Sequence, residues 1–196
     1  GKKYYFKSSG YLYSGWKEVD GDWYYFTTSG AVTGWKQISG SWYYFGSDGV
    51  MWTGLQNIGG TNYYFKSSGA MKTGWQQIGS DWYYFNSSGA MRKSSWLQSG
   101  SAWYYFGSDG RMATGLTTIS GTQYYFKSSG AMKTGWQQIG SDWYYFNSSG
   151  AMRKASWLQS SSKWYYFKAD GKMAANETVT ISGKDYKFNA SGVWVS

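Results

Sequence analysis

The sequence contains no cysteine, no histidine and no proline. The absence of cysteine and histidine excludes disulfides, thiolate nucleophiles, imidazole bases and the usual zinc ligand sets. No apolar run approaches the roughly 18 residues of a membrane-spanning helix, so we expect no membrane span. The opening residues, GKKYYFKSSG, lack the apolar stretch of a secretory signal, and we expect any export signal to lie outside this sequence.

Acidic residues are also scarce, with ten carboxylates against 19 lysines and arginines. Most of the carboxylates fall in turn-like segments that recur along the chain, as Asp48, Asp109 and Asp170 do. They form no unique pair suited to acid–base work. We therefore predict a chain that is not an enzyme, with no catalytic residues, no metal and no cofactor. The formal net charge of +9 favours polyanionic partners.

Aromatic residues, in contrast, make up 23% of the 196 residues, and they fall in register. All ten phenylalanines are spaced 19, 20 or 21 residues apart, and a glycine follows each of them after four residues. All seven methionines lie six residues after a phenylalanine. Residues 61–99 match residues 122–160 at an offset of 61 with two differences. We predict one repeat module over residues 1–196, with nine to ten units of about 20 residues and a higher repeat of three units.

Each unit has the pattern of a β-hairpin followed by a loop. Residues 16–19 and 22–26 are rich in β-formers, and Asp20-Gly21 between them is a strong signal for a two-residue turn. An isolated hairpin is only marginally stable, so the units must stack on one another. The predicted fold is all-β: an elongated β-solenoid of stacked hairpins.

The alternation of side chains along a strand assigns the aromatic residues to two faces. With Asp20-Gly21 as the turn, Trp16, Trp23 and Tyr25 share one face of the hairpin. Tyr24 and Phe26 share the other face, which we interpret as the packing face.

Tryptophans recur as pairs with a spacing of seven residues. The pairs are Trp16/Trp23, Trp35/Trp42, Trp75/Trp82, Trp96/Trp103, Trp136/Trp143 and Trp157/Trp164. Two repeats carry Leu55/Asn62 and Leu116/Gln123 in these positions, so the scaffold tolerates the loss of a pair. Because the indoles occur together or not at all, we interpret each pair as two walls of a binding site rather than as core.

Converging indole and phenol faces suit one class of ligand particularly well. They present a negative quadrupole without a hydrogen-bonding code, which matches a bulky, weakly hydrated quaternary ammonium. Such a contact contributes about 0.5–2 kcal/mol. One site would bind near millimolar, and several sites on one chain would hold a repetitive polymer through effective concentration.

The segments Gly74–Met91 and Gly135–Met152 both read GWxxIxxxWYYFxxxGxM. This pattern resembles the choline-binding repeat of pneumococcal-type surface proteins and murein hydrolases, and the resemblance extends from Tyr4 to Trp194. It implies a left-handed hairpin solenoid with a choline between successive hairpins. Both tryptophans would come from one hairpin, and the second tyrosine of WYY would come from the next.

Carried onto this sequence, the resemblance implies six choline sites. Five of them are Trp16, Trp23 and Tyr44; Trp35, Trp42 and Tyr64; Trp75, Trp82 and Tyr105; Trp96, Trp103 and Tyr125; and Trp136, Trp143 and Tyr166. The sixth pair, Trp157 and Trp164, has Lys187 at the partner position, so this site is either incomplete or closed by another residue. The repeat pattern does not show which methionine lines which site. We expect most of the methionines to pack between repeats.

The partners implied by the resemblance are choline-decorated teichoic and lipoteichoic acids. The protein is then secreted and held at the cell wall of a Gram-positive bacterium, as the binding module of a parent such as a murein hydrolase. Basic residues after the methionine position, such as Lys72 and Arg92, either form a solvated face or attract the phosphates of that polymer. Exposed end hairpins offer edges at which a second copy can pair.

Three alternatives stay open. Glucan-binding repeats of extracellular glucosyltransferases, and related toxin repeats, share the YYFxxxG pattern but usually lack the paired tryptophans. Single-stranded nucleic acid is disfavoured, because the basic residues do not line a groove at any regular spacing. A spacer role is compatible with binding. Competition by free choline, with dextran inert, separates choline binding from the glucan alternative.

Overall fold

The computed structural model describes residues 2–196, and all regular elements in that range are β-strands. Nine antiparallel hairpins follow one another along the chain. They are β1 (Gly15–Val19) with β2 (Asp22–Thr27), β4 (Gly34–Ile38) with β5 (Ser41–Phe45), β6 (Gly54–Ile58) with β7 (Thr61–Phe65), β8 (Gly74–Ile78) with β9 (Asp81–Phe85), β10 (Ser95–Ser99) with β11 (Ala102–Phe106), β12 (Gly115–Ile119) with β13 (Thr122–Phe126), β15 (Gly135–Ile139) with β16 (Asp142–Phe146), β17 (Ser156–Ser160) with β18 (Lys163–Phe167), and β19 (Glu177–Ile181) with β20 (Lys184–Phe188). Two short strands, β3 (Gly30–Ala31) and β14 (Met132–Lys133), extend two of these sheets.

The register of the hairpins follows from their turns. Asp20 and Gly21 have φ of 54° and 88°, and two successive positive φ values are characteristic of a type I′ turn, whose twist matches that of the strands. Trp16 therefore pairs with Tyr25 and Glu18 with Trp23, as the sequence predicts. The all-β fold of stacked hairpins is confirmed.

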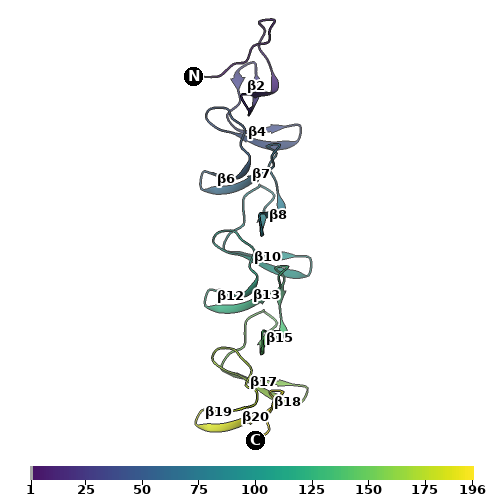
Figure 1. Cartoon of the computed structure of the whole chain (residues 1–196), viewed down its shortest axis with the longest axis vertical. Helices are drawn as coiled ribbons and strands as arrows, with labels where there is room; N and C mark the ends of the chain where they lie inside the picture. Colours follow the sequence, from purple (N-terminus) through teal and green to yellow (C-terminus); the bar gives the residue numbers. More distant parts are fainter. Residues whose placement is uncertain (1) are drawn as a thin grey trace. The chain divides into compact units, whose positions relative to one another are not determined.

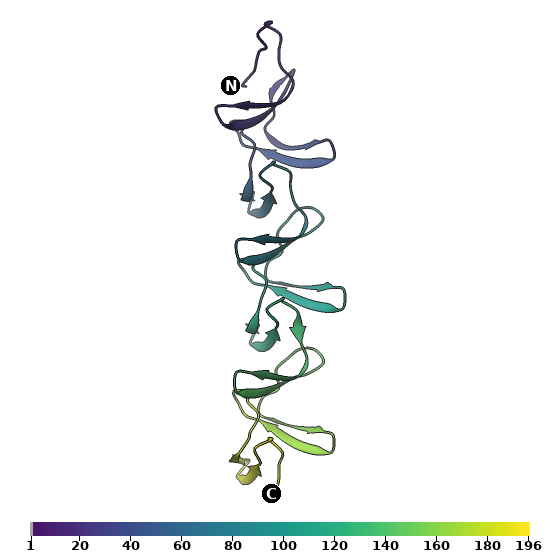
Figure 2. The same cartoon turned by 45° about the vertical axis from the view of Figure 1, so that its right-hand side comes forward.

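The hairpins form two units, which are described separately. The first comprises the described residues up to Ser94 with Gly107–Arg111, and the second comprises Ser95–Phe106 with Met112–Ser196. Within the first unit, the β4–β5 and β6–β7 hairpins project to opposite sides and β8–β9 projects in a third direction (Figure 1). Within the second unit, β10–β11, β12–β13 and β15–β16 show the same succession, which the turned view also displays (Figure 2).

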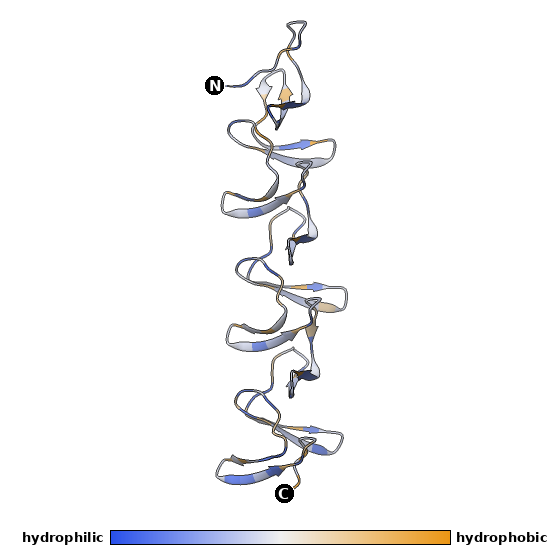
Figure 3. Cartoon of the chain, in the orientation of Figure 1, coloured by the Kyte–Doolittle hydropathy of each residue, from blue (hydrophilic) through white to orange (hydrophobic). Residues whose placement is uncertain are grey.

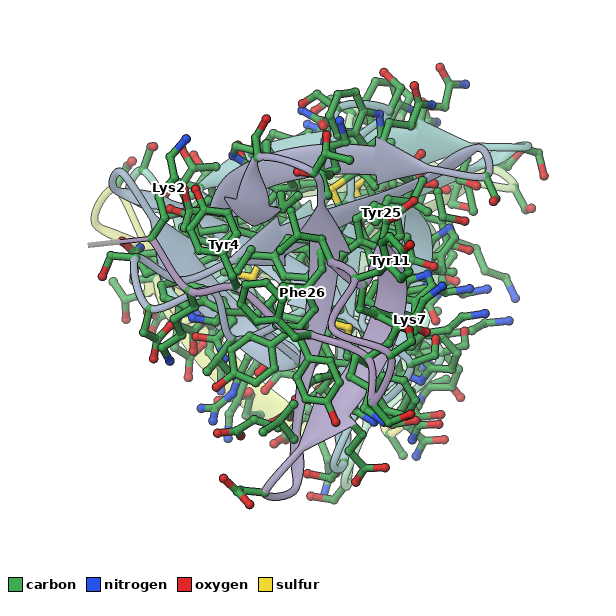
Figure 4. All side chains as sticks on the ribbon, turned by 90° about the horizontal axis from the view of Figure 1, so that it is seen from above. Lys2, Tyr4, Lys7, Tyr11, Tyr25 and Phe26 are labelled. Carbon is green, nitrogen blue, oxygen red and sulfur yellow. The ribbon has the colours of Figure 1, made fainter. Side chains whose placement is uncertain are left out.

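Phenylalanine forms the core of the nine hairpin repeats, whereas Phe6, which precedes them, is exposed. The eight phenylalanines from Phe45 to Phe188 are at most 1% exposed, and Phe26 is 4% exposed. Figure 4 shows Phe26 among closely packed rings, with Lys2 and Lys7 toward the outside of the view. Within each unit, these phenylalanines pack against an aromatic side chain of the preceding hairpin, as Phe45 does against Trp16 at 5.8 Å between centroids. The strands are mostly pale or blue in Figure 3, because tryptophan and tyrosine rank low on a hydropathy scale although they supply most of the packing.

In residues 2–196 no helix is long and apolar enough to cross a membrane. The same residues contain no cluster of three or more His, Cys, Asp or Glu that could hold a metal ion.

Candidate ligand-binding boxes

The two tryptophans of each pair lie on neighbouring strands of one hairpin. In the first pair, Trp16 comes from β1 and Trp23 from β2, on the same face and one diagonal step apart. All six pairs hold their ring centroids 6.3–6.5 Å apart with interplanar angles of 71–84°. We call each pair, with the residues around it, a box, and number the boxes 1 to 6 from Trp16/Trp23 to Trp157/Trp164.

A tyrosine from the next hairpin forms the third wall. In box 1, the ring of Tyr43 lies 4.9 Å from that of Trp16 at an angle of 62°. Equivalent contacts of 4.8–5.0 Å recur in boxes 2, 4, 5 and 6. They join Trp35 to Tyr63, Trp96 to Tyr124, Trp136 to Tyr165 and Trp157 to Tyr186.

These tyrosines are the first of each WYY, whereas the sequence analysis assigned the second: Tyr44, Tyr64, Tyr125 and Tyr166 in boxes 1, 2, 4 and 5. The structure brings the first tyrosine to these boxes and not the second, and which tyrosine contacts the ligand stays a prediction. Tyr44 shares a face with the tryptophans of its own hairpin and lies 5.2 Å from Trp35. A hairpin meets the tryptophan face of its predecessor with its opposite face, which carries the first tyrosine and the phenylalanine. Tyr43 and Phe45 therefore both contact Trp16.

Boxes 1, 2, 4 and 5 enclose open cavities of about 350, 380, 320 and 490 Å³ respectively. These volumes lie at the lower end for small-molecule sites. Box 1 is lined by Trp16 and Trp23, by Tyr43 and Met51 of the next repeat, and by the Ser67–Ser68 loop of the repeat after that. A box thus draws on three consecutive repeats.

The structure also assigns the methionines, which the sequence left unassigned. Met51 is held by its backbone N–H, which donates to the carbonyl of Trp23 at 2.8 Å, and its side chain lines box 1. The same side chain packs on Gly69, where an added Cβ would lie 2.1 Å from the Met51 sulfur. Met51 therefore serves both packing and the box.

Box 6 also has a tyrosine as its third wall. Lys187 stands at the partner position predicted from the sequence, but Tyr186 occupies the wall, 5.0 Å from Trp157. Trp194 takes the methionine position: its N–H donates to the Trp164 carbonyl at 2.9 Å. The Trp194 ring lies 5.9 Å from that of Trp157 and 5.8 Å from that of Tyr186. Box 6 is thus surrounded by four aromatic rings.

In box 3, Trp75 and Trp82 have the same mutual geometry as the other pairs, at 6.3 Å. They belong to the first unit, whereas the predicted Tyr105 belongs to the second. Tyr105 lies 5.2 Å from Trp96 of its own hairpin. The tyrosine wall of box 3 stays a prediction.

The positions that lack a tryptophan pair differ from the boxes. The first tyrosine that follows each of them is buried: Tyr24, Tyr83 and Tyr144 are 8%, 8% and 7% exposed. Met91 packs with Tyr83, and Met152 packs with Tyr144, in two small core clusters. We call these three positions closed junctions and name each by its buried tyrosine.

Ion pairs lie beside two of the closed junctions. Arg111 Nε lies 3.0 Å from Asp81 Oδ2, and Lys172 Nζ lies 2.8 Å from Asp142 Oδ2. A hydrogen bond with Tyr83 and the charge of Asp81 raise the pKa of Arg111, and a hydrogen bond to Asp142 raises the pKa of Lys172. Burial, reinforced by Asp142, raises the pKa of Tyr144.

The boxes stay accessible from outside. The second tryptophan of each pair is about two-fifths exposed, as Trp23 is at 42%. The ring faces, the thioether and the serine hydroxyls supply no carboxylate base and no nucleophile–base pair. This chemistry is that of a binding site for a weakly hydrated cation.

Comparison with protein families supports this chemistry. Seven overlapping segments match the choline-binding repeat: residues 32–73, 52–96, 72–114, 93–134, 113–157, 133–177 and 155–196. Residues 1–12 and 14–32 match the putative cell wall binding repeat. No curated protein matches the chain.

Several solved structures are similar along nearly the whole chain. CbpJ from Streptococcus pneumoniae has a TM-score of 0.83 at 38% identity, over 98% of this chain and 75% of CbpJ. CbpF from the same organism, solved in the presence of a peptidoglycan analogue, has a TM-score of 0.76 at 33% identity, over 98% and 75%. The choline-binding domain of pneumococcal CbpL has a TM-score of 0.64 at 36% identity, over 94% and 98%. The chain belongs to the choline-binding repeat family.

Proposed function

We propose that each box binds one trimethylammonium group of choline, and that the chain thereby anchors its parent protein to choline on teichoic and lipoteichoic acids of a Gram-positive cell wall. The observation that carries this proposal is the geometry of the boxes. Three rings at steep angles surround a cavity of about 320–490 Å³ that is otherwise lined mainly by a thioether and small loop side chains.

The strength expected of one box is modest. A cation over an aromatic face gains about 0.5–2 kcal/mol, and more when the contact excludes water. A single box is then a site of about millimolar affinity, near −4 kcal/mol. Several boxes on one chain raise the overall affinity for a polymer that carries many cholines.

The charge of the chain favours the same partner. Choline on teichoic acids is joined to phosphate, and the net charge of +9 attracts a polyanion. Lys66 directly precedes the Ser67–Ser68 loop at the rim of box 1. Arg153, in contrast, makes contacts within the protein: its guanidinium donates a hydrogen bond to the Trp157 carbonyl and lies 6.0 Å from the Tyr145 ring.

The direct test measures binding of the purified chain to choline-decorated cell walls and to walls grown without choline. We expect binding to the first only, and release by free choline at millimolar concentration. Retention by dextran, without competition by choline, would support the glucan-binding alternative instead.

A second measurement counts the sites by titration with choline. Replacing Trp35 by Leu and Trp42 by Asn copies the Leu55/Asn62 repeat of the same unit. We expect this variant to lose one site and to keep its far-UV circular dichroism. Collapse of the β-structure would show that the indoles are structural.

A further inference from the structure

The closed junctions and the boxes occupy the same place in the repeat. At the Tyr83 junction, the Met91 N–H donates to the carbonyl of Asn62, just as Met51 donates to Trp23 in box 1, both at 2.8 Å. At the Tyr144 junction, Met152 donates to Gln123, also at 2.8 Å. The backbone framework of a site is therefore present at these junctions, and side chains decide whether it is open.

Two positions distinguish the Tyr83 and Tyr144 junctions from boxes 1, 2, 4 and 5. The first is the start of the second strand, four residues before phenylalanine. It holds Asp22, Asp81 and Asp142 at the closed junctions, but Ser41, Thr61, Thr122 and Lys163 at boxes 1, 2, 4 and 5. Aspartate at this position thus marks the closed junctions.

The second position is the loop of the following repeat, five residues after phenylalanine. The loops that line boxes 1, 2, 4 and 5 have Ala70, Ala90, Ala151 and Val193 there. At the Tyr83 and Tyr144 junctions, the residues are Arg111 and Lys172. Each of these basic side chains reaches the aspartate of the first position.

A side chain of the loop fixes the backbone at this second position, as it also does in other loops. Asp109 accepts a hydrogen bond from the backbone N–H of Arg111 at 3.0 Å, and Asp170 does so for Lys172 at 3.0 Å. These aspartates replace the second serine of the loops that line boxes 1, 2 and 4.

The Tyr24 junction has Val50 at the second position, and its cation comes from another segment of the chain. Lys3 Nζ lies 5.1 Å from the centroid of the Tyr24 ring and 3.4 Å from its hydroxyl oxygen. A lysine of the chain therefore stands over an aromatic face as a ligand cation would. Three junctions thus combine a buried tyrosine, an aspartate and a cation supplied by the protein.

We propose that Arg111 and Lys172, held by Asp81 and Asp142, are built-in cations that keep these junctions from binding a quaternary ammonium group. The loop, and not the tryptophan pair alone, then determines which junctions accept choline. The protein's own cation lies close to the tyrosine and repels the ligand cation. This inference rests on the proposed function.

The first arm of the test closes a box. Ser41→Asp with Ala70→Arg places the ion pair at box 1 and changes none of the residues that line it. We expect a choline titration to find one site fewer than in the wild type. Ser41→Asn with Ala70→Gln is the uncharged control of similar size and should keep the wild-type number.

The second arm opens a junction. Leu55→Trp with Asn62→Trp restores the indole pair beside Tyr83, and we expect no additional site. Adding Arg111→Ala and Asp81→Ser to this variant should add one. Circular dichroism and thermal unfolding check each variant, and the second arm decides the matter if the first variant does not fold.

The inference is overturned if the ion pair at box 1 leaves the number of sites unchanged, or if the tryptophan pair alone creates a site. The wild type is titrated first, which separates the two proposals. A wild type that binds no choline refutes the proposed function and this inference with it. A wild type that binds choline leaves the variants to test the inference alone.

Discussion

The indole of Trp16 and the phenol ring of Tyr43 lie 4.9 Å apart, although they belong to successive hairpins. Trp23, the other indole of the box, lies 6.4 Å from Trp16 on the same hairpin. The three aromatic walls of the box therefore meet only when two hairpins are stacked. A ligand that binds only the stacked state stabilises it by mass action, about 2.7 kcal/mol at a concentration 100 times the Kd.

Tyr43 should be the tyrosine on which box 1 depends. Tyr43→Ala removes one wall, and we expect choline affinity at box 1 to fall by about two- to thirtyfold, since an aromatic wall contributes about 0.5–2 kcal/mol. Tyr44→Ala is the matched control, because Tyr44 contacts Trp35 and Trp52 instead. Site occupancy in crystals soaked with graded choline is the measurement. An empty box 1 in the Tyr44 variant, with a filled one in the Tyr43 variant, would restore the sequence-based assignment.

The sequence was sufficient for the hairpins, their register and the tryptophan pairs, because these depend on local alternation and on the Asp-Gly type of turn. Alternation correctly placed Trp16, Trp23 and Tyr25 on one face. Alternation within one hairpin does not show which of its faces packs against the preceding hairpin, because that contact joins two repeats. The choice of the second tyrosine followed the family resemblance, whereas the structure brings the first tyrosine to the box.

One signal in the sequence pointed to the first tyrosine. Every repeat has tyrosine two residues before phenylalanine, including Tyr186, whereas Lys187 breaks the pattern at the next position. The closed junctions were also marked by Asp22, Asp81 and Asp142. Carboxylates in this chain were interpreted only as turn formers, because the basic partners Arg111 and Lys172 lie about 30 residues further along the sequence and meet them only through hairpin stacking.

Gly69 is expected to be essential for box 1 although it lies outside the rings. Its φ is +79°, and an added Cβ would lie 2.1 Å from the sulfur and 2.8 Å from the Cγ of Met51. Gly69→Ala should destabilise the fold by about 1–3 kcal/mol through backbone strain. It should also displace Met51 and weaken choline binding at box 1.

Gly40→Ala is the control for this effect. Gly40 has a similar φ of +82°, but an added Cβ would meet nothing within 4 Å. We expect a comparable loss of stability in urea unfolding, without a change at box 1. Equal weakening of box 1 by both substitutions would show that strain, and not Met51, is responsible.

Stability should fall in alkaline solution because of the Tyr144 junction. The pKa of Tyr144 is raised by burial first and then by Asp142 and Asp170, against an opposing effect of Lys172. The pKa of Lys172 is raised by its hydrogen bond to Asp142 and by that charge. Both protonated forms are favoured in the folded state, so their contribution is fully present below the ordinary pKa values, about 10. It is lost as the pH rises through the folded-state values.

The measurement is the free energy of unfolding as a function of pH between 8 and 11 or so, in the wild type and in Tyr144→Phe. The variant has no phenol to ionise at this junction, so its stability should decline less steeply above about pH 10. The same slope in both proteins would contradict the prediction.

Trp194 should give box 6 a higher affinity for choline than box 5 of the same unit. It occupies the methionine position, and its ring lies 5.9 Å from that of Trp157 and 5.8 Å from that of Tyr186. Indole is the best aromatic face for a cation, and the contact contributes about 0.5–1 kcal/mol at exposed sites. Trp194→Met places a methionine at this position, as in the other boxes, and we expect affinity to fall about two- to fivefold. Occupancy of box 6 relative to box 5 in choline-soaked crystals checks this, since box 5 contains Met173 and serves as the internal reference. If box 6 fills more readily in the variant, the indole plugs the box instead of forming one of its walls.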